Sequence, residues 1–346
     1  MTILEADIGA VGKGHGLLLP LTASDDLEAL GVMGGNLGMV LQGFDLCHRD
    51  GTCRRRFALE GCRGVLRRDL MAALQAALPA GVEQLAGRGL GLSGLPDGTY
   101  RLLTADHGPL QADLIVAADG VASPCRRSLF PAAHLTPERV TELVLDLPVA
   151  EAWQRLEGHC LKFEDPEAGL ALGLLPCGVD RVVIYAQLAT DRYPLPLTVA
   201  GAAELRQLFV GWNHWLDGWL EGLADARVHR WRTTDLDPLP CLHRGNVALV
   251  GDAAHPLLPF TSQGVPAALA DALALGHSLE GVDPSRPTEL MMALARYSDR
   301  RLPALAPLIE QGRHMQQQFL VPAAAGSTPM PPLAGYSSSR VAMAAG

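Results

Sequence analysis

Arg244-Gly-Asn-Val-Ala-Leu-Val-Gly-Asp252-Ala-Ala-His-Pro-Leu-Leu-Pro-Phe-Thr-Ser-Gln263-Gly264-Val-Pro266 is the stretch of this 346-residue chain that decides its fold. Residues 247–250 predict a buried parallel strand ended by Gly251-Asp252, and a loop rich in Pro and Gly leads into a helix over Ala267–Leu279. Unpaired N–H groups at such a helix start point toward the carboxyl edge of the sheet, where open α/β sheets bind ligands. From the spacing alone, an ordinary strand-loop-helix corner explains the stretch equally well.

The composition predicts a folded protein whose partner is a small molecule. The chain is 48% hydrophobic and carries a net charge of −9 with no basic block, which argues against nucleic acid or an anionic membrane as a partner. We find no apolar run of the roughly 18 residues that a membrane span needs, so we expect a cytoplasmic protein without stable membrane insertion. We expect it to be a monomer or a homodimer. Seven cysteines without a C-x-x-C pair indicate reduced structural thiols and no metal site.

The N-terminal residues predict part of a dinucleotide fold. Residues 1–7 form a short strand ending in acids, and Glu5 stands where such folds bind the ribose hydroxyls, although a solvated strand-end acid explains it too. The first strand of that fold, with its G-x-G-x-x-G turn, should precede Glu5 and does not. Gly12-Lys-Gly14 supplies two of the glycines, but Leu17 occupies the third place, so a flexible loop is the better interpretation of residues 9–16.

The segment up to residue 131 alternates helices and strands. Periodicity and turn residues predict a helix over Thr22–Leu30, a hairpin of Met39–Phe44 with Thr52–Leu59, an amphipathic helix over Val65–Leu78, and strands over Gly98–Thr104 and Ala112–Ala118. Arg67 opposes the helix dipole near the start of its helix, so it faces either solvent or a bound anion. The last of these strands leads into Asp119-Gly120.

The remaining chain changes character. Short strands separated by Pro and Gly predict an antiparallel sheet made of Glu142–Leu147, His159–Phe163, Leu170–Leu175 and Arg181–Leu188. A helix over Leu205–Leu220 presents Trp212, Trp215 and Trp219, which we interpret as packing residues. We expect a helical region over Thr288–Phe319 interrupted by Pro303 and Pro307, and a disordered tail from Pro322.

Three separated segments together resemble the FAD-dependent aromatic hydroxylases of the para-hydroxybenzoate hydroxylase family. They are Arg67-x-x-Leu70-x-x-x-Leu74, Ala112 to Ser123 with Asp119-Gly120, and Asn246 to Gly264. The resemblance covers most of residues 1–310. It implies an α/β fold: an FAD-binding Rossmann-like domain of the glutathione-reductase type, an inserted, mostly antiparallel substrate sheet, and a C-terminal helical segment. The implied boundaries are 1–34, 64–131 and 240–285 for the FAD domain, 35–63 and 132–239 for the substrate domain, 286–320 for the helices and 321–346 for the tail.

The resemblance also implies roles for individual residues. Asp252 would bind a ribityl hydroxyl, Arg67 would lie near the phosphates, and Asp119-Gly120 would border the cleft shared with NAD(P)H. The loop from Pro259 would run beside the flavin ring. The full implied cofactor-binding set is Glu5, Arg67, Asp119, Gly120, Gly251, Asp252, Pro259, Gln263, Gly264 and Val265. His255 could lie near the ring, but a structural role is the better interpretation, and no catalytic side chain is assigned.

The implied reaction is hydride transfer from NAD(P)H to FAD, capture of dioxygen as a flavin hydroperoxide, and hydroxylation of a small aromatic or polyketide-like substrate. The helix N-terminus near the ring would stabilise the negative charge of the reduced flavin. The Trp-x-Trp-x-Ile-Pro signature of flavin halogenases is not found in the sequence, which disfavours halogenation.

Two departures from the family leave alternatives open. The family often has Gly-Gln-Gly-x-Asn at the flavin loop, where this chain has Ser262-Gln263-Gly264-Val265-Pro266. The unmatched first strand would cost on the order of 5 kcal/mol of pyrophosphate binding and would leave the Glu5 and Asp252 strands without a shared neighbour. We consider a late-starting chain of an ordinary hydroxylase, a natural short form that acts as an inactive, flavin-poor binding or regulatory protein, and an FAD oxidoreductase that does not hydroxylate.

Overall fold

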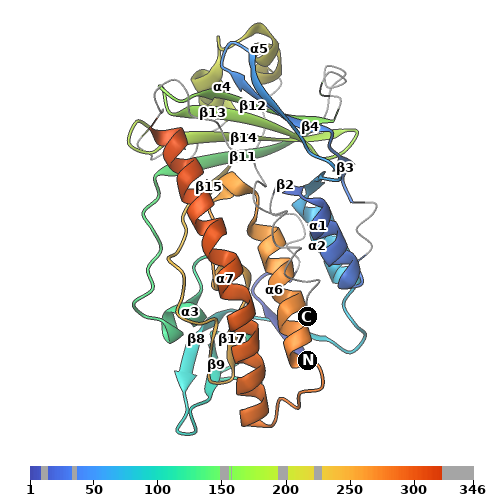
Figure 1. Ribbon diagram of the computed structural model, residues 1–346, viewed down its shortest axis with the longest axis vertical. Coiled ribbons are helices and arrows are strands. Elements are labelled where there is room, and N and C mark those ends of the chain that lie inside the picture. Colours follow the sequence, from blue (N-terminus) through green and yellow to red (C-terminus); the bar gives the residue numbers. More distant parts are fainter. Residues whose placement is uncertain are drawn as a thin grey trace.

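A large sheet lies at one end of the molecule, and helices α1, α2, α6 and α7 separate it from small sheets at the other end (Figure 1). The computed structural model describes residues 1–8, 15–32, 37–148, 156, 158–193, 202–221 and 228–321. The glycine-rich loop expected before residue 15 and the tail expected from Pro322 therefore lie largely outside the described residues. This arrangement of a mixed α/β body with a separate sheet confirms the fold class expected from the sequence.

The large sheet has the strand order β15-β11-β14-β13-β12-β4-β5. Its strands are β4 (Gly43–His48), β5 (Cys53–Ala58), β11 (Val140–Pro148), β12 (His159–Asp165), β13 (Leu170–Pro176), β14 (Arg181–Ala189) and β15 (His229–Arg232). Neighbours are antiparallel except β12 and β4, which run parallel. The four predicted strands are confirmed, with ends shifted by a few residues. The predicted hairpin is found as β4 with β5, but its first strand begins at Gly43, because Met39–Val40 form a separate strand, β3, that pairs with β6 (Arg63–Leu66).

Two short helices cover the outer face of this sheet, where one helix was expected. They are α4 (Ala202–Phe209) and α5 (His214–Glu221). The predicted single helix is wrong because Gly211 adopts a φ of 80° and the Asn213 side chain accepts a hydrogen bond from Leu216 N, which starts a new helix. Trp212 and Trp215 pack against the sheet's apolar face, as expected, whereas the Trp219 side chain lies outside the described residues.

The parallel strands outside the large sheet form two separate pairs at the other end of the molecule. Strand β1 (Thr2–Glu5) pairs with β7 (Glu83–Ala86), and β10 (Ile115–Ala117) pairs with β17 (Val247–Leu249), which β16 (His243–Arg244) flanks on its other side. As expected, the Glu5 strand β1 and the Asp252 strand β17 share no neighbour among the described residues, although β17 is itself paired on both edges. Among the described residues of these two sheets, β1, β7, β10 and β16 each have one edge without a partner, and Val116 on β10 is 47% exposed.

Smaller elements connect these bodies. A second small sheet has the order β2-β6-β3, and β8 pairs with β9. Their bounds, with those of the short helices, are β2 (Gly16–Leu19), α1 (Leu21–Ala29), β3 (Met39–Val40), β6 (Arg63–Leu66), α2 (Arg67–Ala76), β8 (Gly89–Gly94), β9 (Tyr100–Thr104) and α3 (Pro124–Leu129). The helix predicted over Val65–Leu78 begins later than expected, because its first two residues continue β6 and pair with β2.

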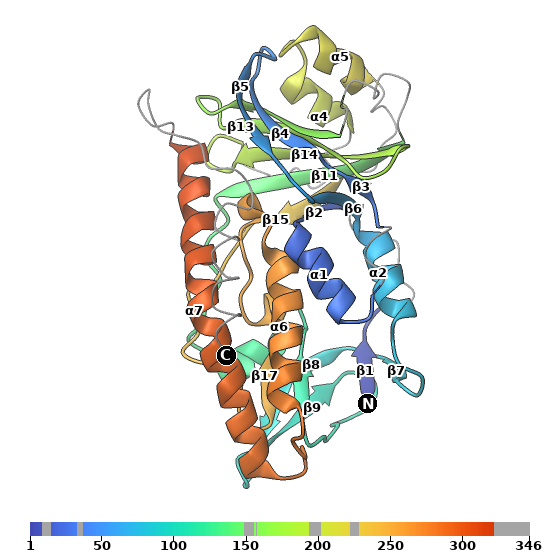
Figure 2. The ribbon, with the colours of Figure 1, turned by 45° about the vertical axis from the view of Figure 1, so that its right-hand side comes forward.

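Helices α6 (Gly264–Leu279) and α7 (Pro287–Leu320) pack along each other below the large sheet (Figure 2). The Tyr297 hydroxyl on α7 donates to Leu249 O at 2.9 Å, which joins this helix to β17. The expected interruption at Pro303 and Pro307 is wrong, since α7 continues through both. Each proline removes one backbone donor, but Leu305 and Ile309 between and beyond them remain buried and hold the helix in place. None of the described helices has the length and apolarity that crossing a bilayer requires.

Candidate functional site

The corner after β17 is fixed by a left-handed glycine and a buried carboxylate. Gly251 has a φ of 57° and begins a short 3-10 helix, η3 (Gly251–Ala253), that carries Asp252. Gly251 N donates to Asp271 Oδ2 at 2.7 Å, and the same carboxyl accepts from His255 Nε2 at 2.5 Å and Arg301 Nε at 2.6 Å. Asp271 is fully buried. His255 thus has the structural role expected for it.

Arg126 ties this corner to the loop after β10. Its guanidinium is buried and donates to the carbonyl oxygens of Asp252 at 3.0 Å and Ala253 at 2.9 Å, and to Val121 O at 2.5 Å. The two loops that carry the Asp-Gly and Gly-Asp motifs are therefore held together by one side chain. Burial lowers the pKa of Arg126, while Asp119 and Asp252 raise it.

Asp252 faces the cavity from the floor of the site. The residue is exposed in the cavity that it lines, and desolvation by the surrounding protein raises the pKa of its carboxyl, whereas His255, Arg126 and Arg67 lower it. Arg67 begins α2 and its backbone N donates to His15 O at 2.6 Å. Both side chains line the same cavity. A carboxylate opposite a cation suits a ligand that carries hydroxyl donors and an anionic group.

The loop before α6 presents backbone N–H groups to the cavity. It contains the 3-10 helix η4 (Pro259–Thr261) and then Ser262 in the left-handed region with a φ of 54°. Gly264 and Val265 open α6 and line the cavity, and a Cβ at Gly264 would meet nothing within 4 Å. Their N–H groups lie in the first turn, where a helix has no internal acceptors, so this end of the cavity favours negative charge.

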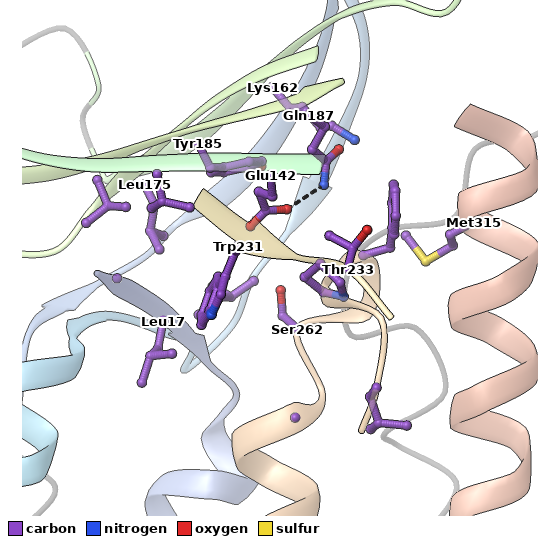
Figure 3. Close-up of a pocket in the computed structure, with 18 of the residues that line it drawn as sticks. Leu17, Glu142, Lys162, Leu175, Tyr185, Gln187, Trp231, Thr233, Ser262 and Met315 are labelled. Carbon is purple, nitrogen blue, oxygen red and sulfur yellow. Dashed lines mark hydrogen bonds between the residues drawn. The ribbon is translucent and has the colours of Figure 1, made fainter. Parts of the chain in front are cut away.

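The cavity lies between this floor and the inner face of the large sheet, and its volume is about 1830 Å³. Figure 3 shows the sheet residues Glu142, Gln187 and Tyr185 on one side and Ser262 on the other. A pocket for one small ligand has about 300–1,000 Å³, so the volume admits a dinucleotide-sized cofactor together with a substrate. The exposed N–H groups, Asp252 and Arg67 fit a flavin with its ribityl chain and phosphates. Among the described residues, no group of three potential metal ligands occurs.

The structure brings most, but not all, of the predicted residues to this cavity. Those that line it are Arg67, Gly120, Gly251, Asp252, Pro259, Gly264 and Val265. Glu5 lies on β1 and accepts a hydrogen bond from Asp7 N at 3.0 Å. Asp119 accepts from Ser123 Oγ at 2.5 Å and Cys125 N at 3.0 Å, so it holds the start of α3. The Gln263 side chain is fully buried, and neither of its polar atoms has a hydrogen-bond partner in the described chain.

Sequence reasoning missed three polar residues of the site. Arg126 could have been suspected, because it is the first charged residue after Asp119-Gly120. Glu142 and Gln187, which face the cavity from β11 and β14, carry no local signal, since only the pairing of the two strands brings them together.

Comparison with known proteins adds the following matches. A family model described as an FAD binding domain matches residues 97–311. The 6-hydroxynicotinate 3-monooxygenase of Bordetella bronchiseptica is 29% identical over 220 residues, which are 62% of this chain and 56% of the relative. The 3-amino-4-hydroxybenzoate 2-monooxygenase of Streptomyces cremeus is 30% identical over 267 residues, 74% of this chain and 62% of the relative. The chain thus spans 56% and 62% of the length of these relatives.

Solved structures show the same fold. Klebsiella pneumoniae HpxO complexed with FAD and uric acid superposes with a TM-score of 0.77 at 21% identity, over 93% of this chain and 88% of that one. Pseudomonas aeruginosa PqsL in complex with 2-aminobenzoylacetate superposes with a TM-score of 0.75 at 21% identity, over 92% of this chain and 89% of that one.

Proposed function

The chain belongs to the FAD binding domain family, and we propose that it is an FAD-dependent monooxygenase that consumes NAD(P)H and dioxygen and hydroxylates a small aromatic compound. The observation that carries this proposal is one continuous cavity, which is bounded by Asp252 and the α6 N-terminus on one side and by the large sheet on the other. It offers a cofactor seat and a substrate space that meet at the loop from Pro259 to Val265.

The residues of the chain have separable tasks in this proposal. Asp252 and Arg67 hold the ribityl and phosphate parts of FAD, and the N–H groups of Gly264 and Val265 stabilise negative charge at the flavin ring. FAD, when bound, supplies the redox and oxygen chemistry. The sheet residues above the loop orient the aromatic ring and exclude water from it. Glu5, Asp119 and Gln263 remain proposed cofactor residues. The Glu5 and Asp119 side chains accept hydrogen bonds from their own segments, and the Gln263 side chain has no hydrogen-bond partner in the described chain.

Reconstitution of the 346-residue chain tests the proposal. The purified chain is incubated with FAD and desalted, and bound flavin is measured by its absorbance. NADH and NADPH oxidation is then followed with 6-hydroxynicotinate, 3-amino-4-hydroxybenzoate and salicylate, the compounds named for its relatives. We expect substrate-stimulated oxidation and a product that gains one ¹⁸O atom from ¹⁸O₂.

Two results would count against the proposal. A chain that holds no flavin at saturating FAD supports the alternative of a binding or regulatory protein. Flavin-dependent NAD(P)H oxidation without labelled product, over a wider panel of phenols and anilines, supports an FAD oxidoreductase that does not hydroxylate. The Glu310→Gln variant, on the exposed side of α7, serves as a matched control for the preparation.

A further inference from the structure

The roof of the cavity carries an unusual polar row. In the register of the sheet, Glu142 on β11 lies directly opposite Gln187 on β14 and opposite Trp231 on β15. Directly opposite residues of antiparallel strands point to the same face, so these three side chains form one row across three strands. All three line the cavity, and Figure 3 shows them on the side of the sheet that faces Ser262.

Glu142 and Gln187 are buried polar groups with unused hydrogen-bonding capacity. Glu142 is 6% exposed and Gln187 is 3% exposed, and Gln187 Nε2 donates to Glu142 Oε2 at 3.0 Å. Gln187 Oε1 has no hydrogen-bond partner in the described part of the chain. Because a carboxylate offers about four acceptor positions, one amide donor leaves most of them open. Burying such groups without partners costs free energy, which a bound ligand with donors would recover.

Two cations of the sheet near this row, Lys162 and Arg230, are already engaged. Lys162 Nζ lies 2.7 Å from Glu164 Oε1 and stands 5.8 Å and 5.7 Å from the ring centroids of Phe260 and Phe319. Arg230 lies 3.1 Å from Glu138 Oε2. Burial raises the pKa of Glu142, whereas the hydrogen bond from Gln187 and the charge of Lys162 lower it. While Glu142 is ionised, a ligand carboxylate at about 4 Å would meet a repulsion of roughly 4 kcal/mol at an effective dielectric constant of 20.

We infer that Glu142, positioned by Gln187, determines specificity at the roof of the cavity: it binds an O–H or N–H donor on an aromatic ligand and excludes ligands that present a carboxylate there. The inference rests on the proposed function only in assuming that an aromatic compound enters this cavity. A site that binds benzoate-type acids would instead need a cation or other donors at this position. Trp231, next in the row, supplies a flat apolar surface for the ring.

A set of three matched ligands tests the inference without relying on turnover. Binding of 4-ethylphenol, 4-ethylanisole and 4-ethylbenzoate to the 346-residue chain with saturating FAD is measured by ligand-observed NMR titration. We expect wild-type protein to bind the phenol about tenfold more tightly than the anisole, as for one charge-assisted hydrogen bond, and the benzoate most weakly. Glu142→Gln should weaken the phenol about tenfold, strengthen the benzoate, and leave the anisole within about twofold.

Two further variants separate specificity from folding. Gln187→Met should weaken the phenol several-fold and leave the anisole unchanged, because it removes only the group that holds Glu142. Glu204→Gln, on the exposed side of α4, should change none of the three affinities. Equal effects of Glu142→Gln on phenol and anisole, tighter wild-type binding of the benzoate than of the phenol, or no binding of any of the three would overturn the inference. If the phenol binds through Glu142 but no compound of the wider panel is hydroxylated, the proposed function fails and this inference stands.

Discussion

Asp271→Asn is the substitution for which the structure gives the clearest prediction. The Asp271 carboxyl is fully buried and accepts hydrogen bonds from Gly251 N, His255 Nε2 and Arg301 Nε. Asparagine keeps the size but removes the charge and replaces one acceptor oxygen by a donor. Breaking a buried ion pair costs about 3–5 kcal/mol, because the remaining cation stays buried without its partner.

The expected loss is large enough to measure directly. At about 2 °C per kcal/mol for a chain of this size, the melting temperature should fall by roughly 6–10 °C. If Gly251 N loses its hydrogen bond to residue 271, the loop that carries Asp252 can move, so the affinity for FAD should fall as well. Thermal unfolding followed by circular dichroism and FAD titration measure the two effects, with Glu310→Gln as the control, which should stay within about 1 °C. A melting temperature within 2 °C of wild type for Asp271→Asn would refute the assigned role.

The pH dependence of stability gives a second check on the same residue. The hydrogen bond and charge of His255, with Arg301, hold the pKa of Asp271 below its ordinary value of 3.8 despite its burial. A carboxyl with a lowered folded-state pKa stabilises the protein fully above its unfolded pKa, and this contribution is lost as the pH falls below 3.8 toward the folded value. The wild type should therefore lose stability more steeply than Asp271→Asn below about pH 4.

Three other predictions follow from single contacts. Asp252→Ala should weaken FAD binding about 10-fold to 100-fold through loss of a charged hydrogen bond, measured by flavin titration, with unchanged affinity contradicting the assignment. Gly173→Ala should destabilise the protein by about 1–3 kcal/mol in urea unfolding, because a Cβ at that position would overlap the Tyr185 ring. Burial and His229 lower the pKa of His15 from 6.5 to about 4, so the unfolded chain binds more protons in that window and stability falls as the pH drops from 6.5 to 4. His15→Gln should flatten that fall in urea midpoints measured across this range, and an unchanged slope would contradict it.

The strand-loop-helix corner at Gly251-Asp252 was predictable from the sequence because its signals are local. Gly251 and Asp252 follow a run of apolar residues, and the Pro and Gly residues after them set where α6 begins. Each of these signals acts within a few residues of the chain, so the type and position of the element follow from the residues themselves.

The roof could not be predicted in the same way, because its residues meet only through strand pairing. In β11, Leu143, Leu145 and Leu147 alternate with Glu142 and Asp146, a pattern that is typical of a strand with one face in solvent. Both faces of this strand are covered, the leucine face by α4 and α5 and the Glu142 face by the cavity and the elements below it. Alternation along the strand therefore does not reveal that the Glu142 carboxyl is buried.

Helix α7 links the two sides of the cavity. Arg301 on this helix binds Asp271 beneath the Gly251 corner, and Phe319 near its C-terminal end lies beside Lys162 on the sheet. A rise of 1.5 Å per residue separates these two positions by about 27 Å along the axis. Because one continuous helix contacts both sides, the distance between the proposed flavin seat and the Glu142 row is set by that helix and by the sheet register. The orientation of a ring between them therefore depends on rigid elements more than on the loop that it contacts.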